Sequence, residues 1–162
     1  MSRMGIMRFA LAAAVLASAV PAPAQPRDDA TLLRTVRTVA DATSGQRIGN
    51  GIVADKVVYF GRNARGEIVV TSVAALAPGA PAAEAPAGAI ALLRTRAATP
   101  GGNQAPDPAD LALARTTGIA IFVVGEWRSP PIVWEVLRQG AELRIRDVDA
   151  RGVAGAWRAP AG

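Results

Sequence analysis

The first half of the chain contains two kinds of hydrophobic pattern, one typical of a helix and one typical of β-strands. Over residues 27–44 the apolar side chains recur at i, i+3, i+4 and i+7, which predicts a helix with one buried face, capped by Asp28 or Asp29 and ended at Gly45. Residues 51–60 and 67–73 are instead rich in β-branched and aromatic side chains, and a Gly- and Asn-containing segment separates them. This arrangement predicts a β-hairpin.

The second half predicts a strand, a helix, another strand and a second hairpin. Residues 89–95 and 119–124 are nearly continuous apolar runs, typical of strands buried on both faces, and a helix is expected to begin at Asp107 between them. That connection is long enough to allow parallel pairing. Residues 132–137 and 143–148 then form a hairpin joined by Gln139 and Gly140, with Arg144 and Arg146 on a solvated face.

Together these elements predict an α+β fold. We expect a mixed β-sheet of about six strands, with an N-terminal helix and one crossover helix. The expected organisation is a single domain over residues 25–150, an Ala/Pro-rich surface loop over 74–88, and a flexible tail over 151–162 that is rich in Gly, Ala and Pro.

The first 24 residues have the pattern of a bacterial signal peptide. Arg3 and Arg8 precede an apolar run over residues 9–20, and Ala22-Pro23-Ala24 is a cleavage sequence. About a dozen apolar residues are too few for a stable membrane anchor. We therefore expect cleavage after Ala24 and a periplasmic or secreted protein.

Composition excludes several classes of chemistry. The chain contains neither Cys nor His, so it has no thiolate ligand, no cysteine nucleophile and no imidazole base. Removing Arg3 and Arg8 leaves 16 basic and 13 acidic residues, which lowers the net charge from +5 to +3. The charges are interspersed and aromatic residues are few, which argues against nucleic acid as a partner.

The only spacing that suggests a functional site lies between the two central strands. Arg94 and Arg96 are two residues apart on a strand, so they share a face at its end, where α/β sheets commonly place their sites. Asp107 and Asp110 open the following helix, and Asp110 can reach back toward Arg96, so we expect Arg94, Arg96 or both to pair with Asp110. Both aspartates are equally explained as an ordinary helix cap with Pro108 at the first helical position.

The order of a strand with R-T-R, a Pro-containing loop and P-D-x-x-D at a helix start resembles the JAB/MPN (JAMM-type) metalloprotease family of bacterial type. In that family a strand H-x-H and a helix Asp bind zinc, a Ser assists, and a Glu acts as general base. The resemblance places Arg94 and Arg96 at the histidine positions, Asp110 at the aspartate and Asp107 at the serine. The general base should fall near residues 47–51, where there is no acid.

Arginine stays protonated and cannot coordinate zinc, so the resemblance implies a pseudoenzyme with no metal, no cofactor and no catalytic residue. The predicted function is an exported binding module for an unknown protein or peptide, received along a sheet edge. One alternative is an anion-binding module that uses Arg47, Arg94 and Arg96. Another is a hydrolase with an unrecognised non-metal mechanism. Glu135 is expected to be a solvated surface acid, and Trp134 to cover the core.

Overall fold

The computed structural model describes residues 29–43, 55–76, 84–96, 105–125 and 131–161. The predicted signal peptide, Arg47 and parts of the predicted loop lie outside these residues. No helix within the described ranges is long and apolar enough to cross a membrane.

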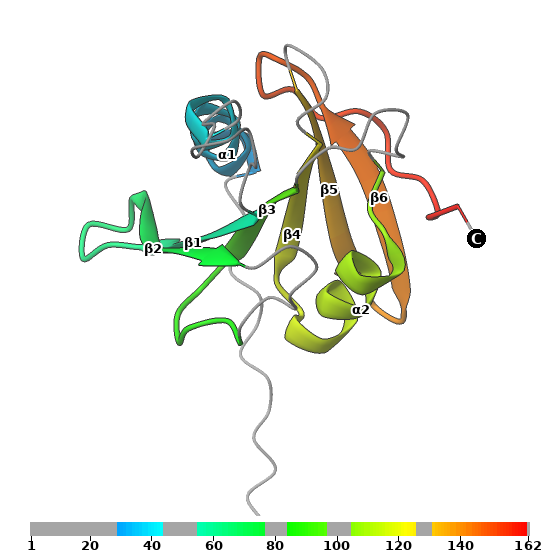
Figure 1. The fold of residues 1–162 in the computed structure, drawn as a ribbon, viewed down its shortest axis with the longest axis horizontal. Coiled ribbons are helices and arrows are strands. Elements are labelled where there is room, and N and C mark those ends of the chain that lie inside the picture. The colour runs from blue at the N-terminus through cyan, green and yellow to red at the C-terminus, as the bar shows by residue number, and fades with distance from the viewer. Residues whose placement is uncertain (1–28, 44–54, 77–83, 97–104, 126–130, 162) are drawn as a thin grey trace, which may run out of the picture.

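The structure confirms the α+β class. Among the described residues, six strands form one mixed sheet in the order β2-β1-β3-β4-β5-β6, accompanied by two helices (Figure 1). The elements are α1 (Asp29–Thr43), β1 (Asp55–Arg62), β2 (Ile68–Leu76), β3 (Ala91–Arg96), α2 (Pro108–Thr117), β4 (Ala120–Gly125), β5 (Ile132–Gln139) and β6 (Glu142–Val148).

One parallel pair lies at the centre of the sheet. β3 and β4 run parallel, joined by the segment that contains α2, whereas every other neighbouring pair is antiparallel. Both central strands are buried on both faces, which explains their continuous apolar sequences. The parallel pairing allowed by the connection length is therefore the one observed.

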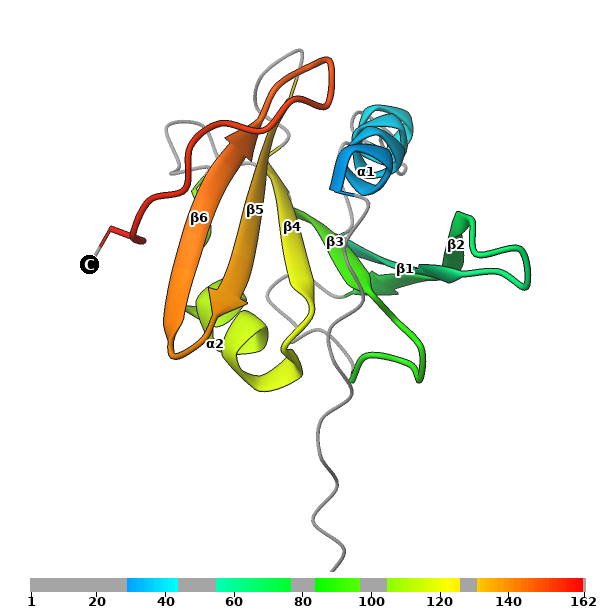
Figure 2. The ribbon, with the colours of Figure 1, turned by 180° about the vertical axis from the view of Figure 1, so that it is seen from behind.

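The two helices cover opposite faces of the sheet (Figures 1 and 2). Leu32, Leu33, Val36 and Ala40 of α1 pack in one core with alternate strand residues such as Val58 and Phe60. Ala114 of α2 packs in the other core, which includes Val57 and Tyr59. Because successive strand residues point to opposite faces, β1 contributes to both cores.

The second hairpin turns one residue later than the sequence suggests. Gln139 still belongs to β5 and pairs with Glu142, so the two-residue turn is Gly140-Ala141. Gly140 has a φ of 64° and no non-glycine residue has a positive φ among those described, as expected for a type II′ turn. This turn places Glu135 opposite Arg146.

Two predicted boundaries are wrong. The segment 74–88 is not a loop throughout, because β2 continues to Leu76 and its last residues pair with Asp55, Lys56 and Val57 of β1. The tail is not loose over residues 151–161 either. Ile145 and Arg158 exchange two backbone hydrogen bonds of 2.9 Å, and the segment runs beside β6 (Figure 2).

Side chains hold this C-terminal segment at both of its ends. At its start, the Asp149 carboxylate accepts hydrogen bonds of 2.8 Å from the backbone N–H groups of Arg151 and Val153. The bond from Val153 is the main cause that holds the pKa of Asp149 below its ordinary value. Near its end, the Trp157 ring stacks on the Arg146 guanidinium at 4.1 Å. The Gly/Ala/Pro-rich composition of the segment does not indicate these contacts.

Replacing Trp157 with Ala should detach the C-terminal segment from β6. Loss of the cation–π contact and of the buried ring area should lower the free energy of unfolding by about 1–3 kcal/mol, measured by urea denaturation. The Ile145 amide, which donates to the Arg158 carbonyl, should exchange faster with solvent. Trp157→Phe should retain part of the protection. Unchanged exchange at Ile145 in the Ala variant would show that the ring does not hold the segment.

Candidate functional site

Arg94 lies at the end of β3 on the face that α2 covers. It pairs with Val57 across the β1–β3 ladder and follows Leu92 on the same face of the sheet. Its side chain therefore lies on the same side of the sheet as the core that contains Val57 and Leu92. Only 5% of its surface is exposed. Its Nη1 donates to Asp110 Oδ1 at 3.2 Å, and its Nη2 lies 4.0 Å from Asp55 Oδ2.

The start of α2 fixes the position of Asp110. Asp107 caps the helix by accepting the Asp110 N–H at 2.9 Å, and Asp110 Oδ2 accepts the Asp107 N–H at 2.9 Å. This reciprocal pair is a capping box, with Pro108 in the first turn. Asp110 is completely buried and directs its two oxygens to different partners, the helix start and Arg94. The capping interpretation and the predicted convergence of Arg94 with Asp110 are therefore both confirmed.

Asp55 is the member of this cluster that the sequence reasoning missed. It begins β1, two residues before Val57, and therefore lies on the same face as Arg94. It is 5% exposed. In the sequence, Asp55 stands out only as an acid next to an apolar run. Its position near Arg94 follows from the long-range register between β1 and β3.

The cluster of Asp55, Arg94 and Asp110 joins one buried cation to two buried carboxylates. Burying an ion costs several kcal/mol, and mutual attraction compensates only when the partners remain in place. The three groups belong to three different elements, so their attraction connects β1, β3 and α2. None of them is exposed enough to meet a substrate.

These residues do not fit zinc. A catalytic zinc needs about three protein ligands with lone pairs, whereas the guanidinium between the two carboxylates is a fixed cation without one. Across the described ranges, no group of three or more acidic, His or Cys side chains is placed to hold a metal ion. The positive charge that a metal would contribute beside Asp110 is already supplied by Arg94.

The remaining predicted residues are only partly placed. Arg96 ends β3 opposite Gly125, but its side chain is outside the described part of the structure, as is Arg47 entirely. Thr95 is buried between the two arginines, and its hydroxyl accepts the Lys56 N–H at 3.1 Å. The predicted convergence of Arg96 with Asp110 therefore stays a prediction.

A second buried ion pair lies between β5 and β6. Arg146 Nε donates to Glu135 Oε2 at 2.6 Å, and both residues are buried. The expectation that Glu135 is solvated and that Arg146 belongs to a wet face is therefore wrong. Trp157 covers the guanidinium, which accounts for its low exposure. This pair lies on the opposite face of the sheet from Trp134.

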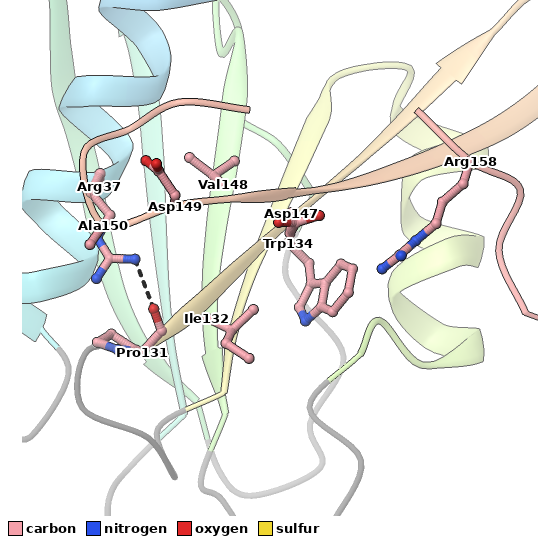
Figure 3. Close-up of a pocket in the computed structure, with 9 residues that line it drawn as sticks. All are labelled: Arg37, Pro131, Ile132, Trp134, Asp147, Val148, Asp149, Ala150 and Arg158. Atoms are coloured by element: carbon pink, nitrogen blue, oxygen red, sulfur yellow. Dashed lines mark hydrogen bonds between the residues drawn. The ribbon is translucent and has the colours of Figure 1, made fainter. Parts of the chain in front are cut away.

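One cavity of about 320 Å³ lies where β5, β6 and the C-terminal segment meet (Figure 3). Its volume falls within the range of small-ligand sites. Trp134 and Ile132 form part of its lining, and the Arg158 guanidinium stacks over the Trp134 ring at 4.8 Å. The Arg37 guanidinium on the other side donates to the Pro131 carbonyl at 2.7 Å and to Asp41. The lining is thus mostly apolar, with its two cations already in contact with protein groups.

In comparisons with protein families, with curated proteins and with solved structures, nothing matched this chain. The JAB/MPN resemblance therefore stays a prediction that rests on the order of residues from Arg94 to Asp110.

Replacing Arg94 with Met should strongly destabilise the fold. The substitution keeps an apolar stem of similar length but leaves two buried carboxylates without their cation, which should cost about 3–5 kcal/mol. Arg62, an exposed arginine on β1, provides a matched control as Arg62→Met. Urea denaturation of the two variants measures the difference. If both lose the same small amount, the cluster does not hold the three elements together.

Proposed function

We propose that this chain is an exported, catalytically inactive domain of JAB-like type that binds an extended segment of protein along the outer edge of β2. The observation that carries the proposal is the character of that edge strand. Export and the JAB-like type rest on the sequence patterns described above.

Inactivity is supported by the state of the predicted site. Arg94 and Asp110 are in direct contact and buried, so neither can reach a substrate without breaking the pair and opening the start of α2. The same contact disfavours the anion-binding alternative, because Arg94 already has two carboxylate partners. That alternative would have to rely on Arg47 and Arg96.

β2 is a long edge strand with no charged residue. Its nine residues read IVVTSVAAL, and two of its valines are exposed, Val70 by 42% and Val73 by 59%. β1 pairs with one side of the strand, and none of the described residues pairs with the other. Natural edge strands usually carry charges or prolines that prevent unwanted pairing. An uncharged, partly apolar edge is instead suited to strand addition.

The opposite edge of the sheet, formed by β6, is protected from pairing with another chain. β6 reads ELRIRDV and carries four charged residues. The C-terminal segment also pairs with it through isolated bridges at Ile145 and Val148. Among the described residues, the chain therefore covers the β6 edge and places no strand along the outer edge of β2.

Binding along β2 should depend on Val73. We expect peptides selected at nanomolar protein from a random decapeptide library to bind the unmodified chain and to lose binding at least tenfold in Val73→Lys, because a charge would then lie within the added strand. Val153→Lys is a matched control, since Val153 is 57% exposed but lies in the C-terminal segment. Selected peptides that bind both variants equally would place the binding site elsewhere.

The purified protein should not retain zinc. Titration followed by native mass spectrometry should show no stoichiometric zinc adduct, because Arg94 supplies the positive charge beside Asp110. Peptide hydrolysis measured in the same samples should not rise on adding zinc. A tight one-to-one zinc complex would contradict the proposed inactivity, and zinc-independent hydrolysis would favour the alternative of a non-metal hydrolase.

A further inference from the structure

We infer that the protein segment received by β2 is β2 of a second copy of this chain, in an antiparallel arrangement about a twofold axis. This inference rests on the proposed strand addition and specifies the partner. A twofold interface places the same patch on both subunits, so the patch must be complementary to itself. β2 meets this requirement in three respects, which are its residue types, the face of the sheet on which matching residues lie, and its lack of charged residues.

The sequence of β2 is self-complementary by residue type. Antiparallel pairing centred between Thr71 and Ser72 places these two hydroxyl residues opposite each other. The flanking pairs are Val70 with Val73, Val69 with Ala74, and Ile68 with Ala75 of the second copy. Apolar residues thus meet apolar residues on both sides of a polar centre. Cross-strand Thr–Ser pairs are favourable through hydrogen bonds, and facing valines bury apolar surface.

An irregularity in β2 brings the matching residues to one face. In a regular strand, residues three apart point to opposite faces, so Val70 and Val73 could not face each other across a twofold axis. The β1–β2 register shifts between Tyr59 and Phe60, which leaves Thr71 as an extra residue. Such a bulge changes the alternation by one position.

After this shift both valines lie on the α1 face. Val70 pairs with Phe60 and Val73 pairs with Val58, and both partners belong to the core under α1. A bulge can also protect an edge by twisting it away from partners. Here its effect is to align the two exposed valines of the strand with their counterparts in a second copy.

Charge does not oppose this pairing. β2 carries no acid or base over its nine residues, so two copies can approach along its whole length without like-charge repulsion. A foreign peptide would also be tolerated, but it would need its own matching sequence. The second copy already has one, and its strand is folded in advance, so less conformational entropy is lost on binding.

Sedimentation equilibrium tests the association. The unmodified chain should form dimers at micromolar to millimolar concentration, and Val73→Lys should shift the dissociation constant by at least tenfold toward monomer. Val153→Lys should leave it unchanged. A chain that stays monomeric throughout, or a dimer that Val73→Lys does not weaken, would overturn the inference.

Cysteine pairing tests the register, since the chain has no cysteine of its own. A mixture of Val70→Cys and Val73→Cys proteins should form a disulfide-linked dimer faster than either variant alone, because directly opposite residues have Cβ atoms about 4.5–5.5 Å apart. Faster linkage within either single variant would overturn this register.

The peptide and dimer experiments together distinguish the two proposals. If the chain is monomeric yet selected peptides depend on Val73, only the second-copy inference fails. If no peptide and no dimer depends on Val73, the proposed function fails as well.

Discussion

The contacts of the buried Arg94 guanidinium with two carboxylates hold the centre of the structure together. The guanidinium lies between Asp55 of β1 and Asp110 of α2, so one side chain connects a neighbouring strand, a central strand and the start of the crossover helix. All three groups are buried, and removing one would leave the others uncompensated. The same contact explains why Asp110 at the start of α2 is acidic and why neither Arg94 nor Asp110 is available to react. Structure and the proposed loss of catalysis thus have one physical cause.

The sequence was sufficient for features set by local chemistry. Hydrophobic patterns predicted α1 and the strands of the described residues, the Asp107–Pro108–Asp110 pattern located the start of α2, and the i, i+2 relation placed Arg94 on the face that meets Asp110. Features that depend on distant register were not predictable in this way. Asp55 joins the cluster only because β1 pairs with β3. Glu135 meets Arg146 only because the hairpin turns at Gly140-Ala141, and moving that turn by one residue changes the cross-strand partner by two positions.

The two sheet edges illustrate how packing overrides composition. The C-terminal segment has the composition of a loose tail, yet it pairs with β6 and stacks Trp157 and Arg158 on opposite faces of the sheet. β2 runs into a low-complexity segment, yet eight of its nine residues pair with β1, and only Thr71 at the bulge does not. The edge richer in charge is therefore the covered one, and the uncharged edge has no second strand beside it among the described residues. This asymmetry supports a binding role that does not require the predicted catalytic positions.

A double-mutant cycle between Arg94 and Asp110 measures whether their buried charges stabilise each other. Asp110→Asn keeps an oxygen for the Asp107 N–H but removes the charge, so combining it with Arg94→Met separates the ion pair from the helix cap. We predict that the double variant loses less stability than the sum of the two separate losses, with a coupling free energy of at least about 1 kcal/mol. Additive losses in urea denaturation would contradict it, because they would show that the buried charges do not stabilise each other.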